Sequence, residues 1–388
     1  MIRELIVTVY LFLFKCIYMF ASLLPLKKKV VIIATFEENA NFLLREFKNQ
    51  ESLGNVILLH EYTKRDCQDN SPTCIHFSNK KPLDLIKAIY YIGTSKTIIL
   101  DNYFAFLSVI KVRKGVEFIQ IWHAAGAIKH FGLLDKSVVT RSQNAKNRFI
   151  RVYEKFDKVV VGSEKMVEVF KEAFQINEGK FLRTGVPRTD IFYNHEIKEL
   201  TTSKLYEEYP QLQGKKVILY SPTYRDGELS SFKLKLDLKK MKQLQEKNYF
   251  LIMKLHPAIK HEKGTLMKDH PDFILDLSHY RRMNDLLLIT DILVTDYSSI
   301  PFEFALRNKP MVFFPYDLKE YQLKRGIFGD YLTSVPGPVA YTTEELITII
   351  LNDNFPYEMI SKYSEEWNTY STGNSSRNLV HYVQNRTN

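Results

Sequence analysis

The sequence is poor in the residues that define disulfide-rich, fibrous and disordered proteins. Its 388 residues include 3 cysteines, 2 tryptophans, 15 glycines and 14 prolines. Three cysteines at irregular spacing are too few for a disulfide framework in a chain of this length, which favours a reducing compartment. Hydrophobic residues make up 45% and charged residues 25% of the chain, so the composition is globular and excludes disorder as the main state.

Familiar signatures of cofactors and metals are also absent from the sequence. The first expected strand leaves into Thr35-Phe-Glu-Glu-Asn39 and not into Gly-x-Gly-x-x-Gly, so a nicotinamide or flavin site there lacks its phosphate turn. The chain has no Walker A lysine loop. One cluster offers side chains that zinc accepts: His60, Cys67, Cys74 and His76. Its spacing matches no familiar site, so we expect a surface loop there, no metal and no cofactor.

The charge balance is positive. Lys and Arg number 54 against 44 Asp and Glu, which gives a formal net charge of +10. Because the excess is spread along the chain, it favours acidic partners such as phosphates or an anionic membrane surface. The basic residues show no interleaved aromatic array of the kind that stacks on bases, so nucleic acid is not expected as a partner.

An apolar stretch over residues 5–26 predicts an N-terminal helix. A narrow polar stripe runs along one side of it: Glu4, Thr8, Lys15 and Ser22. Such a stripe beside a broad apolar face is typical of a helix that lies in the membrane interface. The lysines at 27–29 add about 1 kcal/mol of attraction each near an anionic leaflet. We predict a membrane-associating helix over residues 1–28; a helix docked on the protein itself and a single membrane span are the alternatives.

From Lys29 onward, short apolar runs alternate with longer amphipathic segments. Continuous apolar runs of this length predict strands that are buried on both faces of a parallel sheet. These runs are 30–34, 56–59, 97–100, 118–122, 159–161 and 181–182 in the first half, and 217–220, 250–253, 273–275, 292–294 and 311–314 in the second. A polar stretch over 194–214 separates the two arrays. The pattern predicts an α/β protein with two doubly wound, Rossmann-like domains, 29–200 and 201–388, facing a shared cleft.

Two histidines follow directly on expected strands, where open α/β sheets place their ligands. His123 comes after the strand 118–122, and the small residues Ala124-Ala-Gly-Ala127 beside it would let a bulky substrate approach the backbone. Its imidazole can accept a hydroxyl proton near neutral pH, so a general base is the functional interpretation and a packed structural histidine the alternative. His256, in Lys254-Leu-His-Pro257, ends a strand of the second array and would converge on the same cleft.

Hydroxyl and basic side chains follow other strands. The segment Val294-Thr-Asp-Tyr-Ser-Ser-Ile-Pro-Phe-Glu303 brings hydroxyls and helix N-terminal amides to one point, which suits a phosphate or pyrophosphate. An ordinary helix N-cap is the alternative. Positive charge is supplied by Arg225 in Ser221-Pro-Thr-Tyr-Arg225 and by Arg188 in Arg183-Thr-Gly-Val-Pro-Arg188, unless these arginines pair with structural carboxylates.

In order and spacing, these segments together resemble the CDP-glycerol glycerophosphotransferases of wall teichoic acid synthesis. The resemblance is carried by Trp122-His-Ala-Ala-Gly126, Thr184-Gly-Val-Pro-Arg-Thr-Asp190, Ser221-Pro-Thr-Tyr-Arg225, Lys254-Leu-His-Pro257 and Thr295-Asp-Tyr-Ser-Ser299. It covers nearly the whole chain after the N-terminal helix. It implies a GT-B architecture, with the active site between two Rossmann-like domains, and peripheral attachment to the cytoplasmic face of the cell membrane.

The resemblance also implies the reaction and the roles of residues. Glycerol phosphate would pass from CDP-glycerol, bound by the C-terminal domain, to a polyprenyl-linked acceptor on the N-terminal domain, with release of CMP. His123 would be the base for the acceptor hydroxyl, His256 a pyrophosphate contact, and the segment 296–299 a cradle for donor phosphate. The predicted catalytic residues are His123 and His256, and the predicted substrate-binding residues are Arg188, Ser221, Thr223, Arg225, Asp296, Ser298, Ser299, Glu303, Ser375, Ser376 and Arg377.

The sequence departs from the family pattern at two motifs, the first of which bears on the acceptor and the second on an acidic donor contact. At the first motif, polymerases of the family usually have Trp-His-Gly-Thr-Pro, whereas this chain has Trp122-His-Ala-Ala-Gly-Ala127. Near the C-terminus, polymerases usually have an Asp-Gly-x-Ala-Ser run, whereas this chain has Tyr370-Ser-Thr-Gly-Asn-Ser-Ser-Arg377. The first variant resembles the primase, which adds one glycerol phosphate to undecaprenyl-diphosphate-linked N-acetylmannosaminyl-N-acetylglucosamine. A polymerase of the family and another GT-B nucleotide-sugar transferase are the alternatives, and CDP-ribitol is the alternative donor.

Overall fold

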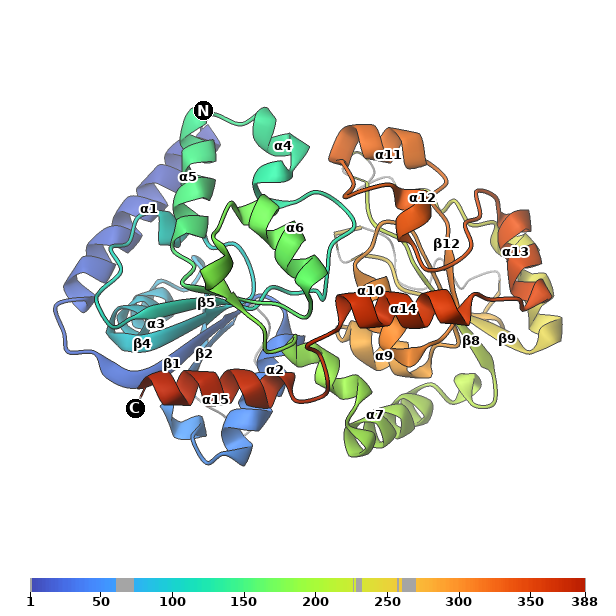
Figure 1. The fold of residues 1–388 in the computed structure, drawn as a ribbon, viewed down its shortest axis with the longest axis horizontal. Coiled ribbons are helices and arrows are strands. Elements are labelled where there is room, and N and C mark those ends of the chain that lie inside the picture. Colours follow the sequence, from blue (N-terminus) through green and yellow to red (C-terminus); the bar gives the residue numbers. More distant parts are fainter. Residues whose placement is uncertain are drawn as a thin grey trace. The chain divides into compact units, whose positions relative to one another are not determined.

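A computed structural model describes residues 2–60, 73–225, 227, 232–256, 258–259 and 270–387. The chain divides into two compact units (Figure 1). The first unit comprises Met1–His123, Phe131–Asp190 and Tyr370–Asn388, and the second comprises Ala124–His130 and Ile191–Thr369. The motif around His123 is therefore shared: the histidine belongs to the first unit, and the small residues that follow it belong to the second.

The first unit is built on a seven-stranded parallel sheet in the order β3-β2-β1-β4-β5-β6-β7. Its strands are β1 (Lys27–Ala34), β2 (Val56–His60), β3 (Thr73–His76), β4 (Ser95–Leu100), β5 (Glu117–Gln120), β6 (Lys158–Val160) and β7 (Phe181–Leu182). Its helices are α1 (Ile2–Ala21), α2 (Glu37–Asn49), α3 (Pro82–Thr94), α4 (Lys136–Val139), α5 (Gln143–Glu154), α6 (Glu164–Phe174) and α15 (Ser375–Thr387). Alternate residues of β1 point to opposite faces. Val30 and Ile32 accordingly share one buried cluster with Leu43 of α2 and Val380 of α15.

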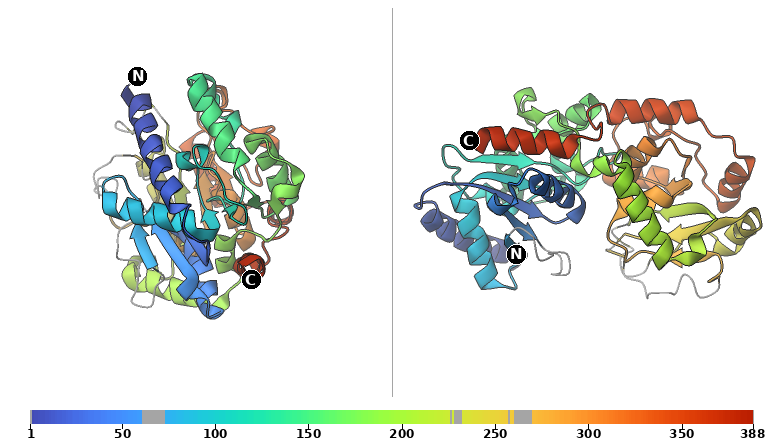
Figure 2. Two further views of the ribbon diagram at one scale, coloured as in Figure 1. Left: turned by 90° about the vertical axis from the view of Figure 1, so that its left-hand side faces the viewer. Right: turned by 90° about the horizontal axis from the view of Figure 1, so that it is seen from below.

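Helix α1 lies along the side of the first unit and packs against α3 (Figure 2). Leu11, Phe14 and Tyr18 of α1 are buried, and the ring of Phe14 stacks on that of Phe106 at 4.6 Å. The opposite side of α1 is apolar and exposed: Leu5, Ile6, Val9, Phe12, Leu13, Met19 and Phe20. By length and composition the stretch Glu4–Ala21, with a mean hydropathy of 1.8, is sufficient to cross a membrane. The helix thus combines a docked face with an exposed apolar face.

The second unit contains a five-stranded parallel sheet in the order β10-β9-β8-β11-β12. Its strands are β8 (Lys216–Ser221), β9 (Tyr249–Met253), β10 (Ile274–Asp276), β11 (Ile292–Thr295) and β12 (Met311–Phe313). Its helices are α7 (His195–Glu208), α8 (Leu238–Met241), α9 (Met283–Ile289), α10 (Ile300–Phe304), α11 (Leu318–Arg325), α12 (Tyr331–Ser334), α13 (Thr343–Asn352) and α14 (Tyr357–Trp367). Tyr220, Leu251, Val294 and Val312 meet in one buried cluster, so all the central strands contribute to this core.

The prediction of an α/β protein with parallel sheets is confirmed, because every expected apolar run overlaps a strand of one of the two sheets. The edge strand β3 was not expected, since its sequence Thr73-Cys-Ile-His76 contains a single strongly apolar residue. The arrangement of two domains around a cleft stays a prediction.

The two units differ from the expected segments 29–200 and 201–388 at three places. Residues 191–200 belong to the second unit, because the first unit ends this stretch at Asp190. Residues 370–388 belong to the first unit, because Leu379, Val380 and Val383 of α15 are fully buried in its core. Residues 124–130 belong to the second unit, because the N–H of His130 donates to the carbonyl of Gly326 at 3.1 Å and the N–H of Phe328 donates to that of Ile128 at 2.9 Å.

Candidate functional site

His123 lies beyond the end of β5, beside the turn that follows β4. The carboxylate of Asp101 accepts hydrogen bonds from the N–H groups of Thr35 (2.8 Å) and Phe36 (2.7 Å) before α2. The carbonyl oxygen of the same Asp101 lies 3.0 Å from Nδ1 of His123. Because a carbonyl oxygen can only accept, Nδ1 carries the proton and the lone pair of the neutral ring is on Nε2. His123 is therefore held as the tautomer that can take a proton through Nε2.

The His123 ring is further fixed by its neighbours. It stacks between Phe36 and Trp122, at centroid distances of 4.6 and 4.4 Å. Trp122 has φ +53°, a left-handed conformation that is strained for a bulky residue. This conformation is secured on both sides, because the N–H of Trp122 donates to Gln120 Oε1 and its carbonyl accepts from Asn39 Nδ2, each at 2.8 Å. Strain next to a candidate base points to a position that the fold maintains for function.

Arg188 supports the same loop from within the first unit. Its side chain is only 8% exposed and forms an ion pair with Glu38. Nη1 donates to the carbonyl oxygen of His123 at 2.5 Å, and the backbone N–H of Arg188 donates to Asn39 Oδ1 at 2.9 Å. The sequence predicts a substrate contact for Arg188, whereas these contacts make it a residue that positions the histidine loop.

Arg225 is the centre of a buried network in the second unit. Nε and Nη2 each donate to Asp317 at 2.7 Å, and Nη2 also donates to Asp296 at 3.1 Å. Nη1 donates to both the carbonyl and the hydroxyl of Thr223 at 2.8 Å. Three tyrosine rings surround the guanidinium at 4.7 to 5.1 Å: Tyr297, Tyr316 and Tyr321. Burial alone would lower the pKa of Arg225, but the bonds to Asp317 and the charge of Asp296 raise it above its ordinary value, so the group stays charged.

These contacts change the interpretation of Arg225 and Asp296. A guanidinium has five N–H donors, and in this network each nitrogen already bonds to the protein. Oδ1 of Asp296 accepts from the N–H and hydroxyl of Thr223 and from the N–H of Tyr297. The sequence leaves open that this arginine pairs with a structural carboxylate, and the structure contains that pairing.

The remaining hydroxyl and acidic candidates of this unit fall into a buried group and a half-buried group. Ser221 is buried, and its hydroxyl donates to the carbonyl of Lys254 at 3.1 Å. Glu303 is buried within α10. Ser298 and Ser299 are half-buried, and Ser298 Oγ accepts from the N–H of Ile300 at 3.3 Å at the start of that helix. Ser298 and Ser299 are thus the members of the predicted phosphate cradle that keep accessible surface.

His256 is held as the opposite tautomer to His123. Its Nδ1 accepts a hydrogen bond from the N–H of Ala258 at 3.1 Å, so the proton of the neutral ring is on Nε2. Part of the residue is exposed, but the ring packs on Tyr224 at 4.5 Å. This desolvation, with the positive charges of Lys129 and Lys254, lowers the pKa of His256 to about 4. At neutral pH His256 is therefore an uncharged hydrogen-bond donor. Pro257, expected to direct this segment, lies outside the described residues.

The C-terminal serines have internal partners. The N–H groups of Ser375 and Ser376, at the start of α15, donate to the two carboxylate oxygens of Asp190 at 2.9 and 2.8 Å. Both serines are buried, whereas Arg377 is exposed. The chain approaches so closely here that a Cβ at Gly185, which has φ +81°, would lie 2.4 Å from Ser375 Oγ. The sequence predicts phosphate at this helix start, but the structure places the Asp190 carboxylate on it.

The run of small residues after His123 also serves packing. Ala124 and Ala125 are buried, and a Cβ at Gly126 would lie 2.8 Å from the ring of Phe302. The expected role of this glycine, to open the backbone to a bulky substrate, is therefore replaced by close contact with an aromatic ring of the same unit.

Each unit contributes its own group of candidates. The first holds His123, Arg188, Ser375, Ser376 and Arg377, and the second holds Ser221, Thr223, Arg225, His256, Asp296, Ser298, Ser299 and Glu303. Sequence reasoning missed Asp101 and Asp317, which hold His123 and Arg225. Asp101 directly follows the apolar run of β4, so a polar residue at a strand end was the available signal. Asp317 lies four residues after β12, and the sequence there gave no signal of its role.

The zinc-type cluster gains no support. The rings of His60 and His76 are 5.8 Å apart at their centroids, and Cys67 lies outside the described residues. Within the described ranges, no group of three or more His, Cys, Asp or Glu side chains is arranged to hold a metal ion.

Comparison with known proteins decides the family. Residues 16–385 match the model of the CDP-Glycerol:Poly(glycerophosphate) glycerophosphotransferase family. The chain belongs to this family. It is an enzyme of the glycerophosphotransferase type, and the resemblance found in the sequence motifs is confirmed.

Individual relatives refine this membership. The chain is 38% identical to the teichoic acid glycerol-phosphate primase of Bacillus subtilis (strain 168) over 99% of both chains. It is 32% identical to the teichoic acid poly(ribitol-phosphate) polymerase of Bacillus spizizenii, but covers only 58% of that protein. Among solved structures, the fold is similar to that of a variant of the wall teichoic acid polymerase TagF, with a TM-score of 0.81, 20% identity, and 99% and 96% of the two chains covered.

Proposed function

We propose that this glycerophosphotransferase is a primase, which transfers one glycerol phosphate from CDP-glycerol to undecaprenyl-diphosphate-linked N-acetylmannosaminyl-N-acetylglucosamine and releases CMP. The 38% identity with a primase over the full length of both chains supports this choice over a polymerase. The observation that carries the mechanism is the pair of strand-end histidines held as opposite tautomers, His123 by Asp101 and His256 by Ala258.

In the proposed reaction, Nε2 of His123 takes the proton of the acceptor hydroxyl. The hydroxyl oxygen then bonds to the phosphorus that bears glycerol, and the bond from that phosphorus to the CMP oxygen breaks. Negative charge that develops on the phosphate oxygens is stabilised by the Nε2–H donor of His256 and by the accessible Ser298 and Ser299. Positioning and charge stabilisation supply most of the acceleration in such transfers.

The GT-B cleft belongs to this proposal. We place the acceptor on the first unit with His123 and the donor on the second with His256, so that the reaction occurs where the two units face each other. The exposed apolar side of α1 and the lysines at 27–29 support peripheral attachment to the cytoplasmic face of the membrane. A lipid-linked acceptor cannot leave the bilayer, so the enzyme must bind there.

The test is CMP release from CDP-glycerol with and without the lipid-linked disaccharide, followed by mass spectrometry of the lipid product. We expect a single added glycerol phosphate even with excess donor. A ladder of products would identify a polymerase, and a preference for CDP-ribitol would change the donor. His123→Gln should lower kcat by about 100-fold or more while KM for CDP-glycerol is kept, because a base acts on the acceptor. Near-normal turnover of this variant would refute the base role.

A further inference from the structure

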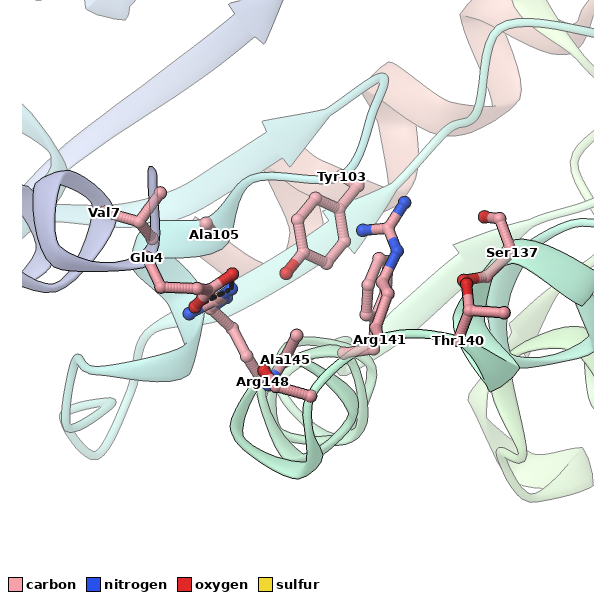
Figure 3. A pocket seen from close by; sticks show the side chains of 11 residues that line it. Glu4, Val7, Tyr103, Ala105, Ser137, Thr140, Arg141, Ala145 and Arg148 are labelled. Atoms are coloured by element: carbon pink, nitrogen blue, oxygen red, sulfur yellow. Dashed lines mark hydrogen bonds and ion pairs between the residues drawn. The ribbon is translucent and has the colours of Figure 1, made fainter. Parts of the chain in front are cut away.

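A cavity in the first unit has no place in the mechanism so far. It has a volume of about 510 Å³ and lies between the start of α1, the turn after β4 and the segment that contains α4 and α5 (Figure 3). This is within the range of small-molecule sites, about 300 to 1,000 Å³. Tyr103, Arg141 and Arg148 give it a polar side, and Val7 and Phe149 an apolar one. We propose that this cavity binds the diphosphate group of the lipid-linked acceptor, an assignment that rests on the proposed function.

The charges of the cavity suit an anion. Arg148 is 15% exposed, and its Nη2 lies 3.2 Å from both carboxylate oxygens of Glu4. Arg141 is exposed, with its guanidinium 5.0 Å from the centroid of Phe149. In the part of the chain that the structure describes, no ion pair joins Arg141 to a carboxylate. One of the two positive charges is therefore balanced internally, and the other is available to a phosphate, which a guanidinium can bind with two parallel hydrogen bonds.

Neutral donors complete the polar side. Burial raises the pKa of the Tyr103 phenol, against the opposing charges of Arg148 and Arg141, so the hydroxyl stays protonated at neutral pH. Ser137 and Thr140 line the wall near Arg141 (Figure 3). The Thr140 hydroxyl donates to the carbonyl of Ser137 at 3.0 Å, so the Ser137 hydroxyl is the further donor on this wall. Two linked phosphates need more donors than one arginine offers, and this wall provides them from separate elements.

The cavity is joined to the candidate base by a short piece of backbone. The carbonyl oxygen of Asp101 holds His123. Tyr103 is two residues after Asp101, so the Cα atoms of Asp101 and Tyr103 are at most about 7 Å apart. The turn between them is fixed, because Gln120 Nε2 donates to the carbonyl of Asn102 at 3.0 Å. In the acceptor, a disaccharide separates the diphosphate from the hydroxyl that reacts. A diphosphate site on this turn would therefore lie close along the backbone to the residue that holds His123.

The lipid part of the acceptor also has a place. Val7 lines the cavity, and its neighbours Leu5, Ile6 and Val9 on α1 are 65%, 63% and 51% exposed. An apolar face of this kind can enter the interface of a bilayer. The prenyl chain would then remain in the membrane beside α1 while its diphosphate enters the cavity.

The test compares Arg141→Gln with Arg151→Gln, which removes an exposed charge of α5 outside the cavity. Arg141→Gln should raise KM for the lipid-linked disaccharide about tenfold or more, as expected for a lost charge-assisted hydrogen bond, with KM for CDP-glycerol unchanged. Arg151→Gln should behave as wild type. Equal kinetics of the two variants would refute the site, and thermal unfolding would verify that both are folded.

A binding experiment separates this inference from the proposed function. Calorimetric titration of the full-length protein with farnesyl diphosphate needs no turnover, so it tests the cavity even if the disaccharide proves not to be the acceptor. We expect binding that Arg141→Gln weakens about tenfold and that phosphatidylglycerol vesicles do not displace. Displacement by these vesicles would make the cavity a general phospholipid site, and equal affinity of wild type and variant would remove it altogether.

Discussion

Replacing Arg225 by glutamine should destabilise the second unit, and not only weaken donor binding. The side chain is 13% exposed, and it bonds to Asp317, which is 17% exposed, and Asp296, which is 2% exposed. Glutamine would leave both carboxylates without their cation. Removing one partner of a buried ion pair costs about 3–5 kcal/mol. Because Asp317 retains some contact with water, we expect the lower end of this range, about 3 kcal/mol.

Thermal unfolding followed by circular dichroism measures this effect. For a unit of this size about 3 kcal/mol lowers Tm by roughly 6–12 °C. The exposed Arg151→Gln serves as the charge-matched control and should change stability by less than about 0.5 kcal/mol. A wild-type Tm for Arg225→Gln, together with a raised KM for CDP-glycerol, would show that the main partner of the guanidinium is a substrate phosphate and would refute the structural interpretation.

Three further predictions test other parts of the structure. Because folded His256 protonates near pH 4 and the unfolded residue near 6.5, lowering the pH from 6.5 to 4 should reduce the free energy of unfolding. In denaturant titrations at several pH values, His256→Asn should weaken this dependence of the unfolding free energy on pH. Gly126→Val should cost about 1–3 kcal/mol in urea unfolding, because the ring of Phe302 occupies the space of the new side chain, whereas Ala127→Val should cost less. Exchanging Phe12 and Phe20 for serine should reduce sedimentation with phosphatidylglycerol vesicles while Tm is kept, because both rings are exposed; unchanged sedimentation would separate α1 from membrane attachment.

The strands were predictable because their signal is local. Runs such as Val30-Val-Ile-Ile-Ala34 are buried on both faces of a parallel sheet, and this burial requires continuous apolar residues. The edge strand β3 is not buried on both faces, so its sequence does not need a continuous apolar run and did not predict a strand. The place of α15 was not predictable, since its apolar residues Leu379, Val380 and Val383 show that the helix packs but do not specify which sheet receives it.

Site residues were predictable by position but not by partner. Strand ends indicated His123, His256 and Arg225 because ligands of parallel sheets collect there. The role of Arg225 depends on Asp317, which is 92 residues away in the chain, and no local pattern encodes such a pairing. The accessible Ser298 and the buried Ser221 also have similar sequence surroundings. Both are hydroxyl residues at or just after the end of a strand, so only the fold separates them.

The two histidines illustrate how their surroundings can assign chemistry. Both follow a strand, but one Nδ1 faces a carbonyl and the other a backbone N–H, which leaves a lone pair on His123 Nε2 and a proton on His256 Nε2. Desolvation of the ring, together with the charges of Lys129 and Lys254, lowers the pKa of His256 and keeps it neutral in the absence of an anion. A bound diphosphate would offset these charges and raise the pKa of His256, since a nearby negative charge favours the protonated ring. We therefore expect donor binding itself to convert His256 from a neutral hydrogen-bond donor into a stronger acid beside the departing CMP, at the step where that phosphate gains charge.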